Sequence, residues 1–468
     1  MFFSRIKTPG IAHNAYILGD QGEAVVVDPR RDIEEYLSVA RENKLAIKYV
    51  IETHRQEDFV LGSAELARVT GAKIVNGRHK LFGHGDIRLE DGERIELAGL
   101  KFLALHTPGH TPESMSYAVF IKDAPEAAWG VFSGDALFIG EAGRTDLPDP
   151  DKTAENAGIL YDSIKSKILP LGDQAHLFPA HGAGSVCGGH IADRDDSTLG
   201  IERRYNPAFT KSRDEFIKGK LEERIPRPPY FKHMEEVNLN GGIPLAMRPS
   251  AVKLLSPKQL HTEMAQGIVI DARSPEAFAG AHIPKSHSVW LAGLPVFGGW
   301  IASKDSRVFL VLNSMDQIDT AVLSLARIGI DGIEGVLAGG FEAWRDAGLP
   351  LEKSGTLAPK EVAKKKSEYV TLDVREVSEF EEEGHIPGAR HMYVGYLDDR
   401  VDEALSGVKK DAPIAVTCSV GHRASLAVSI LERHGYPCVA NLLGGMTAWE
   451  KLGLPLEKGA ERRSKKAA

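Results

Sequence analysis

The sequence predicts an α/β protein of three domains, and three observations lead to this fold class. Its 468 residues suggest about three domains, because domains of soluble proteins hold roughly 150 residues each. Short apolar segments alternate with amphipathic segments over roughly the first 200 residues, as strands and helices alternate in α/β domains. The later part of the chain repeats itself after about 100 residues, which indicates a duplicated domain.

The first region is expected to contain strands and helices in alternation. Three apolar runs predict strands: 24–28, 48–51 and 101–105. Residues 62–69 have the apolar spacing of a helix and predict the helix that follows the second strand. Segments 225–229 and 240–244 are rich in proline or glycine and interrupt regular structure. We therefore expect a first domain over residues 1–245 that includes this proline-rich connector.

The later region contains an internal repeat. Three motifs return in the same order: 271–273 as 373–375, 282–284 as 385–387, and 338–344 as 443–449. A unit of about 100 residues with alternating strands and helices can bury a small parallel sheet, so the repeat predicts two similar domains and not a solenoid. We expect these domains over 246–354 and 355–460, followed by a basic tail over 461–468.

The composition excludes several functional classes. The net charge of -8 is spread along the chain, which argues against binding of nucleic acid or of an acidic membrane surface. No apolar run reaches the length of about 18 residues that a transmembrane helix needs, and the start does not read as a signal peptide. Three cysteines are too few for a disulfide framework. These features predict a cytoplasmic protein that acts on small molecules, with a homo-oligomer left open.

Four polar clusters follow expected strands of the first domain, where α/β scaffolds carry their chemistry. They are 53–59, 107–111, 133–136 and 179–182, and each contains a histidine or an aspartate. The order and spacing of these clusters resemble the metallo-β-lactamase superfamily. This resemblance implies an αββα sandwich for the first domain.

The first cluster departs from the superfamily pattern. Dinuclear zinc hydrolases of this superfamily carry His-x-His-x-Asp-His, whereas Gln56 and Phe59 stand here in place of the second and last histidines. A phenylalanine cannot bind a metal, and a neutral amide is a poor zinc ligand. The second metal position keeps only Asp58, His181 and a share of Asp135, so a two-zinc hydrolase is not expected.

The ligand set that remains is His54, His110 and Asp135. Two histidines and one carboxylate are typical of the facial triad of non-haem Fe(II) oxygenases, which leaves positions open for a substrate and O2. The set is similar to that of the persulfide dioxygenases within the superfamily. That resemblance implies one mononuclear Fe(II) site at which O2 oxidises a thiol persulfide, such as glutathione persulfide, to sulfite. Zinc is the alternative metal.

The same resemblance extends to the segment Gly143–Asp146, which matches a Gly-Arg-Thr-Asp segment of the persulfide dioxygenases. It implies that Arg144 holds the site or binds an anionic substrate, although a structural salt bridge would explain the arginine equally well. Asp58 and His181 are then expected to orient the metal ligands and to move protons.

The last repeat contains a cysteine at the head of a loop between an apolar strand and a helix. A cysteine that faces backbone N–H groups and a helix N-terminus is stabilised as a thiolate or as an anionic persulfide. Phosphatases of similar design place one more residue between cysteine and arginine, so the shorter loop between Cys418 and Arg423 resembles rhodaneses. We expect Cys418 to carry sulfur and Arg423 to add positive charge. The residues expected to bind the substrate are Ser419, Val420, Gly421 and His422.

The middle repeat has the same frame but lacks a cysteine. Its stretch 308–317 places Asn313 where the last repeat has Cys418, and no arginine follows as Arg423 does. We therefore expect an inactive rhodanese-like domain that serves as a spacer or docking surface. Cys187 and Cys438 lack a loop of this kind and are expected to be structural.

The whole chain resembles bacterial fusions of a persulfide dioxygenase with sulfurtransferase domains. That resemblance implies coupling: sulfite and the persulfide of Cys418 would give thiosulfate, or thiosulfate would supply sulfur in reverse, as suits sulfide detoxification. Two other hypotheses stay open. One is a zinc-dependent thioester hydrolase that resembles glyoxalase II and has accessory rhodanese domains, and the other is a metal-free binding module.

Overall fold

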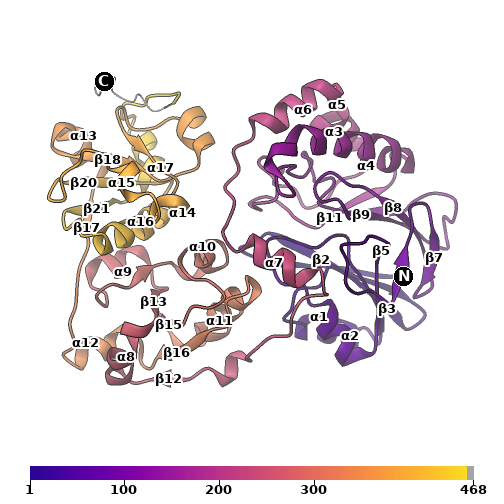
Figure 1. Cartoon of the computed structure of the whole chain (residues 1–468), viewed down its shortest axis with the longest axis horizontal. Coiled ribbons are helices and arrows are strands. Elements are labelled where there is room, and N and C mark those ends of the chain that lie inside the picture. Colours follow the sequence, from indigo (N-terminus) through magenta and orange to yellow (C-terminus); the bar gives the residue numbers. More distant parts are fainter. Residues whose placement is uncertain (461–468) are drawn as a thin grey trace. The chain divides into compact units, whose positions relative to one another are not determined.

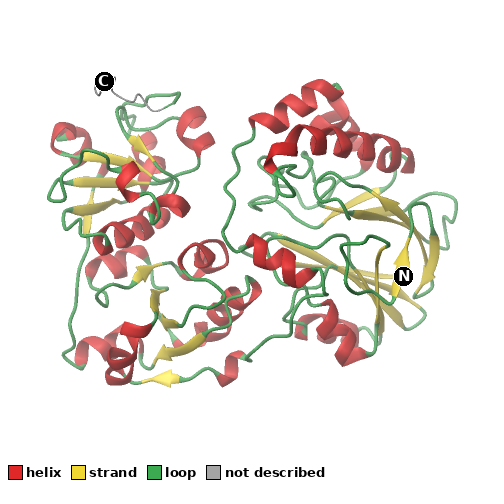
Figure 2. Cartoon of the chain, viewed as in Figure 1, coloured by secondary structure: helices red, strands yellow, loops and turns green. Residues whose placement is uncertain are grey.

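The computed structural model describes residues 1–460, so the predicted basic tail at 461–468 lies outside the described residues. Figure 1 traces the chain, which divides into two compact units. The first unit holds Met1–Ala246 together with Arg327–Gly329, and the second holds Met247–Ala326 and the chain from Ile330 onward. Figure 2 shows that both units are built from helices and strands, as the predicted α/β class requires.

The first sheet of the first unit has six strands in chain order. They are β1 (Phe2–Thr8), β2 (His13–Asp20), β3 (Glu23–Val27), β4 (Ala46–Ile51), β5 (Lys73–Gly77) and β6 (Ile87–Leu89). The first three strands pair antiparallel, and β3 to β6 pair parallel. Parallel neighbours need a crossover, which α1 (Glu34–Glu42) provides between β3 and β4 and α2 (Ser63–Thr70) between β4 and β5.

The second sheet of this unit has five strands in the order β11-β10-β9-β8-β7. They are β7 (Arg94–Leu97), β8 (Leu100–His106), β9 (Met115–Phe120), β10 (Gly130–Gly134) and β11 (His176–Pro179). All neighbours are antiparallel except β10 and β11. The helices of this half are α3 (Thr153–Ser163), α4 (Leu199–Tyr205), α5 (Pro207–Thr210), α6 (Arg213–Glu222) and α7 (Phe231–Asn238).

Three apolar layers hold the first unit together. Val26 of β3 packs with Tyr36 of α1 in the outer layer of the first sheet. Its neighbour Val27 points to the opposite face and packs with Phe102 of β8 between the two sheets, as the two-residue period of a strand requires. Leu160 of α3 lies in the outer layer of the second sheet. Each such side chain contributes about 1.5–3 kcal/mol through burial, so the three layers define the expected αββα sandwich.

The local predictions for the first unit are confirmed. The expected strands at 24–28, 48–51 and 101–105 correspond to β3, β4 and β8. The helix expected at 62–69 is α2, and it ends at Gly71, whose φ of 73° is readily adopted only by glycine.

The second unit contains two five-stranded sheets with the same strand order, and every strand pair in them is parallel. The first sheet contains β12 (Leu254–Leu255), β13 (Ile268–Asp271), β14 (His287–Ser288), β15 (Val308–Val311) and β16 (Ile333–Leu337). The second contains β17 (Gly355–Leu357), β18 (Val370–Asp373), β19 (Arg390–His391), β20 (Ile414–Thr417) and β21 (Val439–Leu442). The identical order shows that the sequence repeat is a repeat of structure.

Helices cover both of these sheets. The first sheet is accompanied by α8 (Pro257–Glu263), α9 (Pro275–Gly280), α10 (Leu294–Ile301), α11 (Ile318–Arg327) and α12 (Gly340–Asp346). The second is accompanied by α13 (Pro359–Lys364), α14 (Val394–Leu397), α15 (Val401–Ala404), α16 (His422–Arg433) and α17 (Gly445–Lys451). No helix within residues 1–460 is long and apolar enough to cross a bilayer.

The repeated sequence motifs have matching structural roles. Arg273 binds the buried carboxylate of Asp271, and Arg375 binds that of Asp373 in the same geometry. Each arginine also donates to a backbone carbonyl of the following segment, which ties that segment to the end of the strand. The repeated histidines and tryptophans match too: His282 and His385 stack on Phe278 and Phe380, and Trp344 and Trp449 donate to the carbonyls of Pro350 and Pro455.

We predict that Arg375→Met destabilises the last domain, because it leaves the buried carboxylate of Asp373 without its cation. Breaking a buried ion pair in this way costs about 3–5 kcal/mol. Hydrogen–deuterium exchange of the β18 amides should therefore accelerate by roughly a hundredfold or more. Arg273→Met is the matched control, which should accelerate exchange in β13 and leave β18 unchanged. Unchanged protection of β18 in Arg375→Met would contradict this role of the ion pair.

Candidate functional site

The three predicted metal ligands and His181 lie in loops that follow four strands of the first unit. His54 follows β4, His110 follows β8, Asp135 follows β10 and His181 follows β11. All four side chains are fully buried. The sandwich therefore gathers into one place residues that are far apart in the sequence.

Asp135 lies within reach of both predicted histidine ligands. Its Oδ2 atom is 3.7 Å from Nε2 of His54 and 3.5 Å from Nε2 of His110. Within the described part of the chain, none of these three atoms has a hydrogen-bond partner of normal geometry. Buried polar atoms without partners are costly, so their convergence indicates a place for a bound group. The structure thus brings together His54, His110 and Asp135.

Backbone and side-chain contacts set the tautomers of the two histidines. His110 donates from Nδ1 to the carbonyl of Arg144 over 2.8 Å. Nδ1 of His54 is 2.9 Å from Oγ1 of Thr53 and 3.4 Å from Nε2 of Gln56. The Thr53 hydroxyl donates to Asp28 over 2.7 Å, so in the shorter of the two contacts it accepts from His54. Both Nε2 atoms then carry a lone pair, which is the form of imidazole that binds a metal.

This donor set fits one divalent cation. Two imidazole lone pairs and a carboxylate oxygen are ligands that Fe(II) and Zn(II) both accept. Burial lowers the pKa of His54 and keeps it neutral. Burial also favours the neutral form of Asp135, but the nearby His181 and His54 hold its pKa well below the usual range, so it is a carboxylate.

The remaining predicted residues, Asp58 and His181, form a separate chain of contacts behind Asp135. His181 lies 2.8 Å from Asp135 through Nδ1 and 2.9 Å from Asp58 through Nε2. Burial alone would lower the pKa of His181, but Asp135 and Asp58 together raise it well above the ordinary value. His181 therefore bridges the two carboxylates, with Nδ1 hydrogen-bonded to Asp135 and Nε2 facing Asp58.

Two further buried residues border this chain of contacts. Phe59, which stands in place of a histidine, is buried with its ring 4.1 Å from the ring of His13. Cys187 lies beside Asp58 and His181, with possible ligand atoms of the three residues within 4.8 Å of one another. Burial raises the pKa of Cys187 well above its ordinary value, so the sulfur is a neutral thiol.

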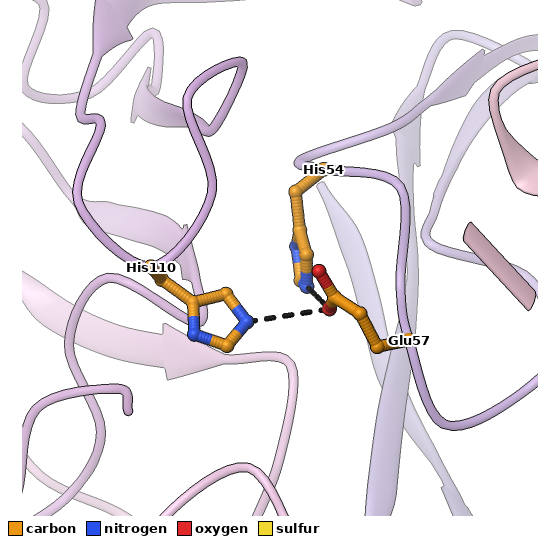
Figure 3. A group of neighbouring side chains, drawn as sticks. All are labelled: His54, Glu57 and His110. Atoms are coloured by element: carbon orange, nitrogen blue, oxygen red, sulfur yellow. Dashed lines mark ion pairs between the residues drawn. The ribbon is translucent and has the colours of Figure 1, made fainter. Parts of the chain in front are cut away.

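Glu57 is a residue at the centre that the sequence interpretation missed. Figure 3 shows its carboxylate next to the rings of His54 and His110. Its Oε2 atom is 3.8 Å from Nε2 of His54 and 3.4 Å from Nε2 of His110. Burial favours its neutral form, but the two histidines and Arg55 lower the pKa of Glu57 to about 2. Glu57 occupies a variable position of the superfamily motif, so the spacing of motif residues gave no signal for it.

A buried asparagine holds the loop that carries His54 and Glu57. Asn238, the last residue of α7, donates from Nδ2 to the carbonyls of Gln56 and Phe59 over 2.8 and 2.7 Å. Its Oδ1 accepts from the N–H of Leu61 over 2.9 Å. One side chain therefore satisfies three backbone groups of the loop, and nothing in the sequence marked Asn238 for this role.

Arg144 lies behind His110. Its guanidinium is buried, binds Asp146 over 2.8 Å and donates to the carbonyls of Val186, Ile225 and Pro226. The backbone carbonyl of Arg144 accepts a hydrogen bond from His110. Arg144 therefore links this predicted ligand to the proline-rich connector that follows α6. This geometry is that of a residue that holds the site.

A cavity of about 260 Å³ lies beside His181. Its lining includes Thr8, His13, Asn14 and the charged residues Arg5, Lys7, Asp193, Arg194 and Asp195. Arg5 contacts Asp195 and Asp196, Lys7 binds Asp195, and Arg194 contacts Glu202, so the basic side chains of this wall are paired with acidic ones. The lining includes His181 but none of the three predicted metal ligands.

The predicted sulfur-carrying cysteine lies in a loop of the second unit. Cys418 directly follows β20, and Gly421, with φ of 109°, caps the start of α16. The N–H of Gly421 donates to Sγ of Cys418 over 3.1 Å. The loop is fixed from the other side, because the carbonyl of Cys418 accepts from the N–H of Met446 over 2.8 Å. A sulfur cradled by a backbone N–H at a helix N-terminus is favoured as an anion.

The charge near this cysteine is shared with a residue that the sequence interpretation missed. Arg423 binds both carboxylate oxygens of Glu379 over 2.6 and 2.7 Å and donates to Oγ of Ser419 over 2.6 Å. Burial would raise the pKa of Glu379, but its bonds to Arg423 lower it to about 2. The guanidinium is therefore held in one orientation and its charge is largely balanced.

Val420 and His422, the other two side chains of the loop, have different surroundings. Val420 is 49% exposed at the tip of the loop. The ring of His422 lies 4.8 Å from the ring of Trp290, which belongs to the middle repeat. In the middle repeat the equivalent strand β15 is followed by Asn313, whose N–H donates to Gln317, and Met315–Gln317 form a short 3₁₀ turn in place of a cysteine loop.

Comparison with known families agrees with this architecture. Residues 8–181 match the metallo-β-lactamase superfamily, and residues 256–347 and 358–452 each match the rhodanese-like domain. The chain belongs to the metallo-β-lactamase superfamily through its first domain and carries two rhodanese-like domains after it.

Individual relatives show two different activities by name. The chain is 31% identical to the mitochondrial persulfide dioxygenase of Homo sapiens over 237 residues, which is 49% of this chain and 84% of the relative. It is 30% identical to a hydroxyacylglutathione hydrolase of Haemophilus influenzae over 212 residues, 41% of this chain and 89% of the relative. A metallo-β-lactamase structure from Staphylococcus aureus aligns with a TM-score of 0.64 at 30% identity, covering 72% of this chain and 98% of that one.

We predict that Asn238→Ala loosens the loop that carries His54. The change leaves two carbonyls and one N–H buried without partners, at a cost of about 1–3 kcal/mol for each group that water cannot reach. The unfolding transition of the first domain should therefore fall by several degrees in scanning calorimetry. Asn43→Ala, which removes an exposed side-chain bond to the carbonyl of Val39, is the control and should shift the transition by less than about one degree. Equal shifts in the two variants would refute the proposed clamp.

Proposed function

We propose that the first domain is a mononuclear iron persulfide dioxygenase and that the last domain is a sulfurtransferase acting on Cys418. The observation that carries the first proposal is the donor set. His54, His110 and Asp135 leave buried atoms free for one cation, whereas His181 bonds Asp135 through Nδ1 and faces Asp58 with Nε2 at 2.9 Å. A site for one metal with several open positions suits an oxygenase, which must bind a substrate and O2 together.

The residues of the first domain have separate roles in the proposed dioxygenase reaction. Bound iron supplies the chemistry that activates O2. The carbonyl of Arg144 and the hydroxyl of Thr53 keep the two imidazoles in the form that binds metal. His181, held between two carboxylates, supplies or accepts a proton next to Asp135.

The reaction balances without another reductant. A persulfide RSSH, O2 and water give RSH and sulfurous acid, which ionises to sulfite. The outer sulfur passes from a formal oxidation state of zero to plus four and loses four electrons, and O2 accepts those four. A thiol persulfide and O2 are thus a complete set of substrates.

The sulfurtransferase step follows from the cysteine loop. The persulfide sulfur on Cys418 is an anion next to the N–H of Gly421 and the start of α16. Sulfite attacks its outer sulfur, the S–S bond breaks, and thiosulfate leaves while the Cys418 thiolate is restored. The reverse reaction loads Cys418 from thiosulfate. The middle repeat has Asn313 at the equivalent place, so we propose that it transfers no sulfur.

Zinc-dependent thioester hydrolysis is the second candidate, because a hydroxyacylglutathione hydrolase matches the chain at similar identity. Gln56 and Phe59 disfavour this candidate, since neither supplies a good ligand for a second zinc. A metal-free binding module is the third. Metal analysis of protein purified without oxygen separates the three, because about one iron per chain supports the dioxygenase, zinc supports the hydrolase, and neither supports the module.

The direct test is turnover in an oxygen electrode. Glutathione persulfide and other low-molecular-weight persulfides are supplied to the iron-loaded chain, and sulfite is measured as product. We expect one O2 consumed for each sulfite formed when sulfite is not converted further. Hydrolysis of hydroxyacylglutathione without O2 uptake would overturn the proposal in favour of the hydrolase.

We predict that the two activities separate by mutation. Cys418→Ser should abolish sulfur transfer from thiosulfate and leave persulfide-dependent O2 uptake intact, because the two sites are distinct. Cys438→Ser is the matched control, since it changes an exposed cysteine of the same domain and should leave both activities intact. Joint loss of both activities in Cys418→Ser would contradict separate sites.

The complementary variant is His110→Ala. Loss of this imidazole should lower bound iron and O2 uptake by at least about tenfold and leave sulfur transfer at Cys418 unchanged. His176→Ala, at an exposed histidine on β11, is the control and should keep its iron. Retained O2 uptake in His110→Ala would exclude His110 as a ligand.

A further inference from the structure

Glu57 combines three features that an ordinary buried glutamate does not share. It is fully buried, its Oε2 makes no hydrogen bond of normal geometry within residues 1–460, and that atom faces Nε2 of both His54 and His110. The two nitrogen atoms are the same ones that contact Asp135. A carboxylate oxygen is therefore aimed at the place that the predicted ligands share (Figure 3).

The other oxygen of Glu57 is already engaged. Oε1 lies 3.5 Å from Nε of Arg55, and this buried guanidinium also contacts Glu113. Arg55 thus fixes the plane of the Glu57 carboxylate and leaves Oε2 directed at the histidines. A side chain with one oxygen anchored and one oxygen free is arranged as metal-binding carboxylates are, whose second oxygen is hydrogen-bonded by the protein.

The backbone of the loop also favours this orientation. Gln56 has φ of 40°, in the left-handed region that non-glycine residues rarely adopt. This turn lies between His54 and Glu57, and the carbonyl of Gln56 is bound by Asn238. The chain accepts local strain at the residue that directs Glu57 toward the two histidines, and a strained backbone persists where the surrounding contacts fix it.

We propose that Glu57 is a fourth metal ligand of the first domain, additional to His54, His110 and Asp135. Two neutral imidazoles and two carboxylates would balance the charge of one divalent cation. The inference rests on the metal centre of the proposed function and not on the identity of the substrate.

The test is metal affinity, measured on the full-length chain with Fe(II) and with Co(II) under anaerobic conditions. Each ion is titrated in competition with a chelator, and the visible spectrum of bound Co(II) reports its ligand field. We expect Glu57→Gln to bind both ions about 10 to 100 times more weakly and to alter the Co(II) spectrum. The amide keeps the shape of the side chain, so the loss follows from the missing charge and ligand.

Glu235→Gln is the matched control. It also removes one carboxylate beside Arg55, at 3.5 Å, but no contact joins Glu235 to either histidine among the ion pairs of the described chain. The metal affinity of Glu235→Gln should stay within about threefold of that of the parent protein. This change is smaller than the loss that is typical when a group supporting a metal ligand is removed. Should Glu57→Gln fail to fold, Glu57→Asp retains the charge with a shorter reach and must give an intermediate affinity.

Two results would overturn the inference: a Glu57→Gln protein with parent affinity and an unchanged Co(II) spectrum, or a Glu57→Asp protein with parent affinity. These outcomes are distinguishable from failure of the proposed function. If the metal affinity depends on Glu57 but the protein turns over no persulfide, only the proposed function is contradicted. If the protein turns over persulfide but its metal affinity does not depend on Glu57, only the inference about Glu57 is contradicted.

Discussion

The candidate metal centre depends on one constraint, the burial of polar atoms that face one another without partners. Leaving such atoms unpaired inside a protein costs free energy, so the sandwich tolerates them only where another group completes their contacts. Nε2 of His54 and His110 and Oδ2 of Asp135 share this condition. The surrounding contacts maintain it: Thr53 and the carbonyl of Arg144 occupy the opposite nitrogens, so the free atoms stay directed inward.

The proposed single-metal site depends on what occupies the neighbouring region. In the first cluster Gln56 and Phe59 stand in place of histidines, and His181 lies between Asp58 and Asp135 in the region that those histidines would have served. In the proposed function His181 holds a proton next to one metal and does not bind a second one.

The duplicated domains show how a shared frame can carry different chemistry. The Asp–Arg pairs 271–273 and 373–375 perform the same structural task in both copies, and both sheets have the same strand order. The loops after β15 and β20 differ instead, because side chains at a loop can change without disturbing the parallel sheet. Trp290 of the middle copy nevertheless packs beside His422 of the loop that follows Cys418, so the middle copy contributes to the surroundings of that loop.

The sequence by itself determined the fold class and the duplication, because apolar periodicity and repeated motifs are local properties of the chain, and it named His54, His110, Asp135 and Cys418 as candidate site residues. Only the tertiary structure decided which other groups meet them. Glu57 and Asn238 reach the first site from a variable motif position and a distant helix, and Glu379 reaches Arg423 across 44 positions of the chain. Such partners carry no local pattern, since what brings them together is the packing of sheets and loops and not their neighbours in the sequence.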